Sequence, residues 1–265
     1  IVDSTGAVIF DDQLLTNNAL GNYPFNRGGD YTIRVYGDGT ATGSYTFTLT
    51  TVAEEASTEL GDARIVTEGA VIANLDGDIG TAGEEDAYTL TVEAGQILYF
   101  DAVEGSNDIW WSATDAGGAR LFRNSWTREN SDPGRFTLET AGDLTITVTG
   151  TNETTGAYSL QIWQVPDTTT TPVEIQQFDT ALPPAEQPGI NGEIAFVGQE
   201  VAYTFEAEPG QVVYFDAQQG STNIRWTVQD SRGEDVFAGS WTREGDDPGR
   251  YDLSLGGTYT MTFDG

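Results

Sequence analysis

The sequence predicts an all-β chain built from tandem β-sandwich domains, and three observations lead to that prediction. Apolar and polar residues alternate with a period of two, as they do in strands with one buried face. Gly, Asn and Asp divide the chain into segments of 5–8 residues, about eight for each long repeat. No stretch shows a helical period, so the short segments are expected to be strands of a sandwich.

The alternation is clearest in three segments of the central part of the chain. Their apolar positions are Tyr88, Leu90 and Val92, then Leu144, Ile146 and Val148, then Tyr158, Leu160 and Ile162. Because successive side chains of a strand point to opposite faces, each set is expected to point into one core. Trp111 and Trp226 follow isoleucines on alternating segments and are expected in cores as well.

A long internal repeat organises the chain. GQILYFDAVEGSNDIWW begins at Gly95 and GQVVYFDAQQGSTNIRW begins at Gly210, an offset of 210 − 95 = 115 residues. The alignment runs without a gap from 77–150 to 192–265, with about 35 of the 74 positions identical. Similarity of this extent indicates a tandem array with a period of about 115 residues.

A third, partial copy stands at the start of the chain. Residues 30–37 resemble 143–150, and residues 43–49 resemble 156–162. We therefore expect residues 1–52 to be the C-terminal half of a first repeat, residues 53–165 a complete sandwich, and residues 166–265 a second repeat that lacks its last strand. Half a sandwich has too little core to fold alone, so completion by preceding residues or by another chain is expected.

The segments between repeats differ in composition from the repeats themselves. Residues 51–62 are acidic and small, and residues 166–189 contain four threonines in a row and several prolines. Such segments are typical of linkers or of leading edge strands, and proline makes the second one stiff.

Composition excludes several classes of function. The chain has 42 acidic residues against 11 basic ones, a net charge of −31, which disfavours nucleic acids and anionic lipids as partners. It has no cysteine and no histidine, so Ser-His and Cys-His nucleophiles and the usual zinc ligands are absent. No apolar run approaches the ~18 residues of a membrane span. An acidic chain without lysine indicates an extracellular protein, with calcium as the cation to consider.

The order of short motifs in the central repeat resembles bacterial pre-peptidase C-terminal (PPC-type) domains of large secreted or surface proteins. The motifs are Gly83-x-x-Asp86-x-Tyr88, Ala94-Gly95-Gln96, Asp115-x-x-Gly118, Ala141-Gly142-Asp143 and Thr155-Gly156-x-Tyr158. The resemblance implies a jelly-roll-like sandwich, export and a non-catalytic accessory or adhesive role. Some members of that family bind calcium, and some attached to collagenases bind collagen. The second repeat departs from the pattern, because Val201 stands where the central repeat has Asp86.

A cluster of carboxylates is the candidate metal site. Counted from Asn74, the residues Asp76, Asp78 and Glu85 take positions 3, 5 and 12 of an EF-hand-like loop, with Asp86 adjacent. Position 6 is Ile79 instead of glycine, and no helices flank the segment. The alternatives are a calcium-bound turn and a solvated acidic loop.

Tryptophan and arginine recur as candidate contact residues. Trp126 and Arg128, like Trp241 and Arg243 in the next repeat, stand two residues apart and are expected to share one face of a strand. They are interpreted either as an inter-unit or ligand contact or as a local staple. Trp110 points away from Trp111 and is expected either to stack on a sugar ring or to pack on a neighbouring unit.

Taken together, these features predict a non-catalytic, extracellular structural or adhesive segment of a large bacterial protein. Its expected partners are neighbouring repeats or subunits, and completion of a sheet edge between units would let it form fibres. The alternative is a calcium-assisted module that binds polysaccharide or a collagen-like protein.

Overall fold

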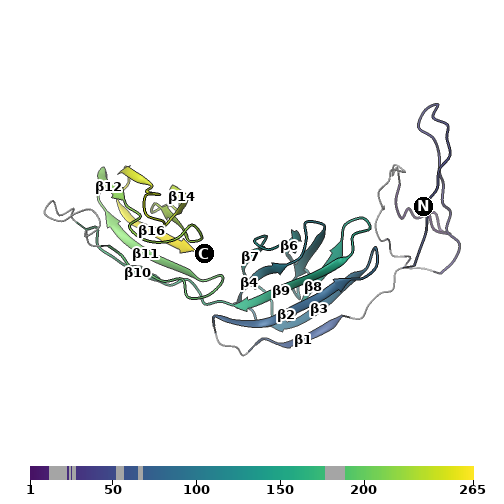
Figure 1. The fold of residues 1–265 in the computed structure, drawn as a ribbon, viewed down its shortest axis with the longest axis horizontal. Helices are drawn as coiled ribbons and strands as arrows, with labels where there is room; N and C mark the ends of the chain where they lie inside the picture. The colour runs from purple at the N-terminus through teal and green to yellow at the C-terminus, as the bar shows by residue number, and fades with distance from the viewer. Residues whose placement is uncertain (12–22, 24, 26–27, 52–56, 65–67, 177–188) are drawn as a thin grey trace.

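The computed structural model describes residues 1–11, 23, 25, 28–51, 57–64, 68–176 and 189–265. Its sixteen named elements are all strands, which confirms the predicted all-β class. Two sandwiches lie in a row, with the N-terminal segment at one end and β12 of the second sandwich toward the other (Figure 1). The described residues include no helix long and apolar enough to cross a membrane.

The first sandwich contains nine strands in two sheets. They are β1 (Thr58–Asp62), β2 (Ala70–Ile79), β3 (Glu85–Val92), β4 (Ile97–Glu104), β5 (Ile109–Thr114), β6 (Arg120–Trp126), β7 (Gly134–Thr137), β8 (Gly142–Gly150) and β9 (Gly156–Gln164). One sheet has the order β1-β3-β8-β5-β6 and the other β2-β9-β4-β7. The strand β1 is a parallel edge strand on β3, so part of the acidic segment before the repeat belongs to the sheet.

The second sandwich contains seven strands. They are β10 (Thr170–Pro172), β11 (Glu200–Ala207), β12 (Gln211–Phe215), β13 (Arg225–Gln229), β14 (Asp235–Trp241), β15 (Gly249–Leu253) and β16 (Gly257–Asp264). Its larger sheet, β10-β11-β16-β13-β14, has the same order as the β1 sheet of the first sandwich. The strand β11 begins 115 residues after β3 (200 − 85 = 115), and β16 begins 115 residues after β8 (257 − 142 = 115).

The cores lie between the sheets, where the alternating pattern places them. All nine apolar residues named above from the first sandwich are buried, most of them with no more than 1% of their surface exposed. Trp111 and Trp226 are buried at equivalent places, as expected, and each packs edge-on against a phenylalanine of the opposing sheet, Phe100 or Phe215. Burial of these large side chains is the main stabilising contribution in each unit.

In the described residues, the second sheet of the second sandwich has two strands, β12 and β15. In the first sandwich β4 pairs with β9 on one edge, and β2 pairs only with β9. The equivalent of β9 would follow residue 265. The described part of the segment equivalent to β2, residues 189–194, forms no strand.

The described residues of the N-terminal segment form no named strand. Two isolated bridges join Val2 to Val8 and Val2 to Thr32. Residues 36–51 are all exposed, including the segment 43–49 that resembles β9. The segment 43–49 carries the sequence pattern of a strand but pairs with no strand in the described part of the chain.

Candidate functional site: the junction between the two sandwiches

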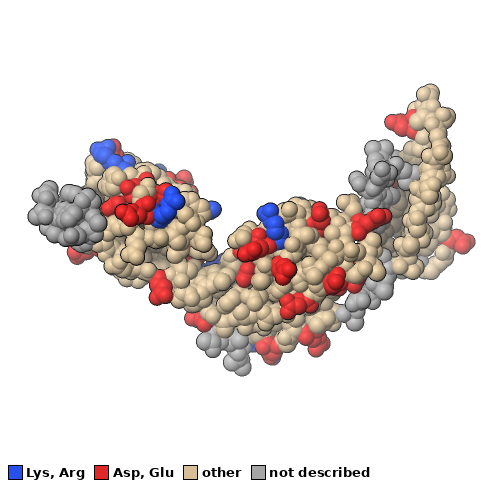
Figure 2. All heavy atoms as spheres, viewed as in Figure 1, with Lys and Arg blue, Asp and Glu red and all other residues tan. Residues whose placement is uncertain are grey.

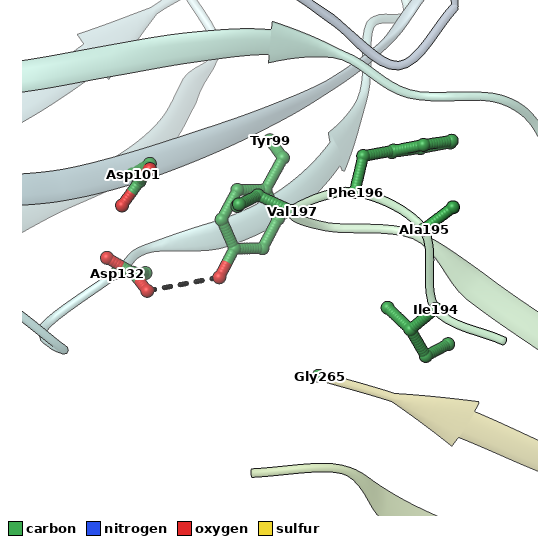
Figure 3. Close-up of a pocket in the computed structure, with 8 residues that line it drawn as sticks. All are labelled: Tyr99, Asp101, Asp132, Ile194, Ala195, Phe196, Val197 and Gly265. Atoms are coloured by element: carbon green, nitrogen blue, oxygen red, sulfur yellow. Dashed lines mark hydrogen bonds between the residues drawn. The ribbon is translucent and has the colours of Figure 1, made fainter.

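A loop of the second sandwich packs directly on the first. Residues 194–197, in the loop before β11, line a pocket together with Tyr99 of β4 (Figure 3). A Cβ atom placed on Gly198 would lie only 2.4 Å from Cγ of Tyr99, and one on Gly69 would lie 2.8 Å from Cδ1 of Phe196. Both glycines therefore let backbone and aromatic ring approach more closely than any other residue would allow.

An ion pair joins the two units beside this contact. Nη1 of Arg135, on β7, lies 2.9 Å from Oε2 of Glu200, at the start of β11. The second terminal nitrogen of Arg135, Nη2, donates to the carbonyl of Pro166. The Thr168 hydroxyl donates to Oε2 of Glu200, the oxygen that Arg135 contacts. Only 16% of the Arg135 side chain is exposed, so the pair is better shielded from water than an ordinary surface ion pair.

A pocket with two carboxylates lies at the same junction. The Tyr99 hydroxyl donates to Oδ2 of Asp132 at 3.1 Å, and Nε1 of Trp163 donates to Oδ2 of Asp101 at 3.3 Å. Burial, and then the charge of Asp132, raise the pKa of Asp101. Burial, followed by neighbouring carboxylates, also raises the pKa of Tyr99. Gly265, which follows β16, lines the pocket from the second unit.

Within the described ranges, no three acidic side chains come together in a group that could hold a metal ion. Oδ1 of Asp132 accepts a hydrogen bond from the backbone of Ala102, so this carboxylate fixes the turn before β7. What the geometry provides is a fixed contact between successive units.

The second sandwich carries an uncovered copy of the surface that receives this contact. The Tyr214 hydroxyl donates to Oδ2 of Asp247 at 3.3 Å, as Tyr99 does to Asp132. Tyr214 is 63% exposed, and Arg250 pairs with the nearby Asp252 instead of with another unit. The charge of Asp247 is the first cause of the raised pKa of Tyr214, whereas burial is the first cause for Tyr99.

The carboxylates expected to bind calcium lie in two different sheets. The predicted loop is wrong, because residues 74–79 belong to β2, where Asp76 and Asp78 occupy exposed positions. Glu85 and Asp86 begin β3 of the other sheet. Asp76 accepts a hydrogen bond from the Ser159 hydroxyl, and Asp86 accepts one from the Tyr158 hydroxyl. Within the described residues, these four acids do not gather into a group of three or more that could hold a metal ion.

The aromatic and arginine residues pair differently from the expectation. The expectation that each Trp-x-Arg pair shares one face of a strand is wrong, because β6 and β14 end at the tryptophans and the arginines lie beyond them. Trp126 instead packs edge-on against Trp110 across the strand pair, with ring centroids 4.5 Å apart. In the second sandwich, the guanidinium of Arg225 lies 4.2 Å from the ring centroid of Trp241.

The two predicted arginines make local contacts. Nε of Arg128 donates to the Ser131 hydroxyl at 3.3 Å, and Arg243 pairs with Asp246 at 2.9 Å. Both contacts lie in the turn after the strand. Within the described residues, this agrees with the interpretation of these arginines as local staples.

The junction residues themselves were not singled out in the sequence. Arg135 and Tyr99 do stand in blocks that recur at Arg250 and Tyr214. That recurrence marks these positions as shared features of the two repeats. A repeat shows which positions are equivalent but not which of them meet across units, so the pairing of Arg135 with Glu200 required the structure.

Comparisons with known proteins supply no family. No family model and no curated protein matches the chain. Among solved structures, the periplasmic inhibitor of g-type lysozyme from Aeromonas hydrophila is 18% identical, covering 41% of this chain and 98% of that one, with a TM-score of 0.31. Its Salmonella Typhimurium counterpart is 14% identical, covering 40% and 99%, with a TM-score of 0.28.

Rat MASP-1 supplies a second kind of neighbour. Its CUB1-EGF-CUB2 domains are 10% identical, covering 79% of this chain and 94% of that one, with a TM-score of 0.26. These scores are too low for any of the neighbours to carry an argument about function, and the sandwich architecture rests on the strands described above.

Proposed function

We propose that the chain is a non-catalytic structural or adhesive segment of a large extracellular bacterial protein, in which sandwiches follow one another as spacer units. One observation carries this proposal: the surface on which the first sandwich holds the second is present again, uncovered, on the second. Tyr99, Asp132 and Arg135 form the occupied copy, and Tyr214 and Arg250 belong to the uncovered one. A surface repeated in this way suits a row of units joined by the same contact.

The acidic surface and the ordered PPC-type motifs support an extracellular location. Acidic residues are spread over the visible faces of both sandwiches and arginines are few (Figure 2). Such a surface keeps a long protein soluble and separate from anionic polymers. Antibodies against the chain should label intact cells of the source organism, and labelling only after permeabilisation would contradict the proposed location.

The spacer function requires the junction to hold a fixed geometry in solution. The chain has no native cysteine, so Glu139→Cys and Ser254→Cys introduce two exposed and equivalent sites for spin labels, one in each sandwich. Pulsed electron paramagnetic resonance should give one narrow distribution of distances between the labels. A broad distribution would mean that the sandwiches move independently, which would contradict the proposed spacer function.

The second candidate function is binding of a polysaccharide or a matrix protein through the tryptophan pair. Trp126 is 36% exposed and lies over Trp110, whose buried Nε1 has no hydrogen-bond partner. An exposed aromatic pair of this kind offers a stacking surface for a sugar ring. Glycan and collagen arrays should detect binding that Trp126→Ala abolishes. Trp241→Ala, at the equivalent position of the second sandwich, is the matched comparison. If the arrays detect no binding, this second candidate function is contradicted and the structural function remains.

A further inference from the structure

We propose that Thr169, Thr170 and Thr171 carry O-linked sugars, which cover the open edge of β10 at the start of the second sandwich. The three residues belong to the run Thr168–Thr171, which stands between Pro166 and Pro172. The inference goes beyond the spacer function and is tested separately from it, because sugars on this segment do not depend on a fixed geometry of the junction.

The composition of the segment is the first observation. Runs of threonine next to proline are typical of O-glycosylated segments of exported proteins. Proline keeps such a segment extended, so that neighbouring hydroxyls stay accessible to an enzyme. The structure agrees with this requirement, because residues 169–172 are all exposed.

The four threonines of the run are not equivalent. The Thr168 hydroxyl donates to Oε2 of Glu200 at 2.6 Å, so it is held in the junction and is partly buried. Among the described residues, no hydrogen bond engages the hydroxyls of Thr169, Thr170 and Thr171. These three hydroxyls are therefore the candidate acceptors, and Thr168 is a structural residue.

The backbone shows what the sugars would cover. The strand β10 runs beside β11 at the edge of its sheet (Figure 1). The N–H of Val173, directly after β10, donates to the carbonyl of Thr204 in β11 at 2.7 Å. Alternate residues of a strand direct their backbone groups to opposite sides, so Pro172 and Thr170 face the open edge. Pro172 has no N–H to offer there, which leaves Thr170 as the residue of β10 with an open donor.

The equivalent edge of the first sandwich is protected by charge. The strand β1 occupies on β3 the place that β10 occupies on β11. It carries the exposed acids Glu59 and Asp62, whereas β10 has no charged residue although the net charge of the chain is −31. An edge strand without charges can pair with another chain unless something covers it. Bulky, hydrated sugars on residues 169–171 would supply that cover.

The modification is a simple group transfer. The threonine Oγ attacks the anomeric carbon of an activated sugar whose leaving group is a phosphate ester. A new bond forms between Oγ and the anomeric carbon, the bond from that carbon to the phosphate oxygen breaks, and the hydroxyl proton passes to a base of the glycosyltransferase. The transfer needs no oxidant or reductant.

Mass spectrometry of the chain isolated from its source organism tests the inference. Cleavage after Glu153 and Glu174 releases one peptide, residues 154–174, that contains the whole run. The peptide should be heavier than its sequence by whole sugar residues, which electron-transfer fragmentation should place on residues 169–171. Mild alkali should remove the sugars and leave an unsaturated residue at each site. A peptide with the mass of its sequence, or equal modification of the exposed Thr155, would overturn the inference.

Substitutions in the source organism locate the sites independently. Thr169→Val, Thr170→Val and Thr171→Val together should abolish the added mass of the peptide, and valine preserves the branched side chain that suits a strand. The matched control, Thr154→Val with Thr155→Val, should leave the added mass unchanged. Added mass that survives the triple substitution would overturn the assignment to these residues.

The covering of the edge is tested with unmodified chain made in a host that lacks the glycosyltransferase. At about 1 M salt the Debye length is about 3 Å, so the unmodified chain should associate in sedimentation experiments and the glycosylated chain should not. Thr170→Glu places a charge at the open edge and should prevent that association. Thr155→Glu adds the same charge elsewhere and should not. An unmodified chain that stays monomeric, or an equal effect of the two substitutions, would overturn the covering of the edge.

Discussion

Gly198→Ala is the sharpest perturbation of the junction. Gly198 has φ of +73°, and an added Cβ would lie 2.4–2.5 Å from Cγ, Cβ and Cδ2 of Tyr99 in the other sandwich. Ordinary contact begins near 3.4 Å, so the two units must separate locally by about 1 Å (3.4 − 2.4). Because the close atoms include Cβ and Cγ, rotation of the tyrosine ring does not relieve the overlap.

Gly210→Ala is the matched control in the same sandwich. Gly210 has φ of +80° and nothing within 4 Å of an added Cβ. Both substitutions therefore impose the same left-handed strain, about 1–2 kcal/mol, and only Gly198→Ala adds the clash. Spin labels at positions 139 and 254 should show a broadened distance distribution for Gly198→Ala and the parental one for Gly210→Ala. Identical distributions for the two variants would refute the described contact.

Three further results are expected. Burial and the charge of Asp132 raise the pKa of Asp101, so the contribution of Asp101 to stability is complete at low pH and falls as pH rises through that raised pKa. Asp101→Asn should therefore raise the Tm at pH 7 and change it little at pH 3.5. An equal change of Tm at the two pH values would contradict this cause. Leu160 is buried, so Leu160→Ala should lower the free energy of unfolding by about 2–5 kcal/mol in urea titrations. Phe47 aligns with Leu160 in the repeat but is exposed, so Phe47→Ala should change the free energy of unfolding by less than about 0.5 kcal/mol. Removal of calcium with EDTA should leave the Tm unchanged, since Asp76 and Asp86 lie in different sheets, and a fall would restore a calcium site.

The fold was largely predictable because its determinants are local and repeated. The period of two identified the buried faces of β3, β8 and β9, and Trp111 and Trp226 are in the cores as expected. The segments before the repeats were expected to be linkers or edge strands, and β1 and β10 are edge strands. In both cases the signal lies within a few residues of the feature that it predicts.

The contacts that depend on register or on two distant segments were not predictable. Trp126 meets Trp110 because a register shift in the β5–β6 pair sets them opposite each other, and sequence spacing does not reveal such a shift. The acidic segment around Asp76 resembled a loop by composition, but pairing with β9 made it a strand. The Tyr99–Gly198 contact joins two units, and no periodicity within one unit encodes it.

The most direct test of the central claim, a repeat array, is to add the strand that the repeat predicts after residue 265. A copy of residues 151–165 joined after Gly265 would place Tyr158, Leu160 and Ile162 equivalents on the free edge of β12. Each buried apolar side chain contributes about 1.5–3 kcal/mol, so the Tm of the second sandwich should rise clearly. The matched control carries aspartate at the leucine and isoleucine positions of the added copy. An unchanged Tm, or an equal rise with the control, would contradict a repeat array in which every unit needs this strand.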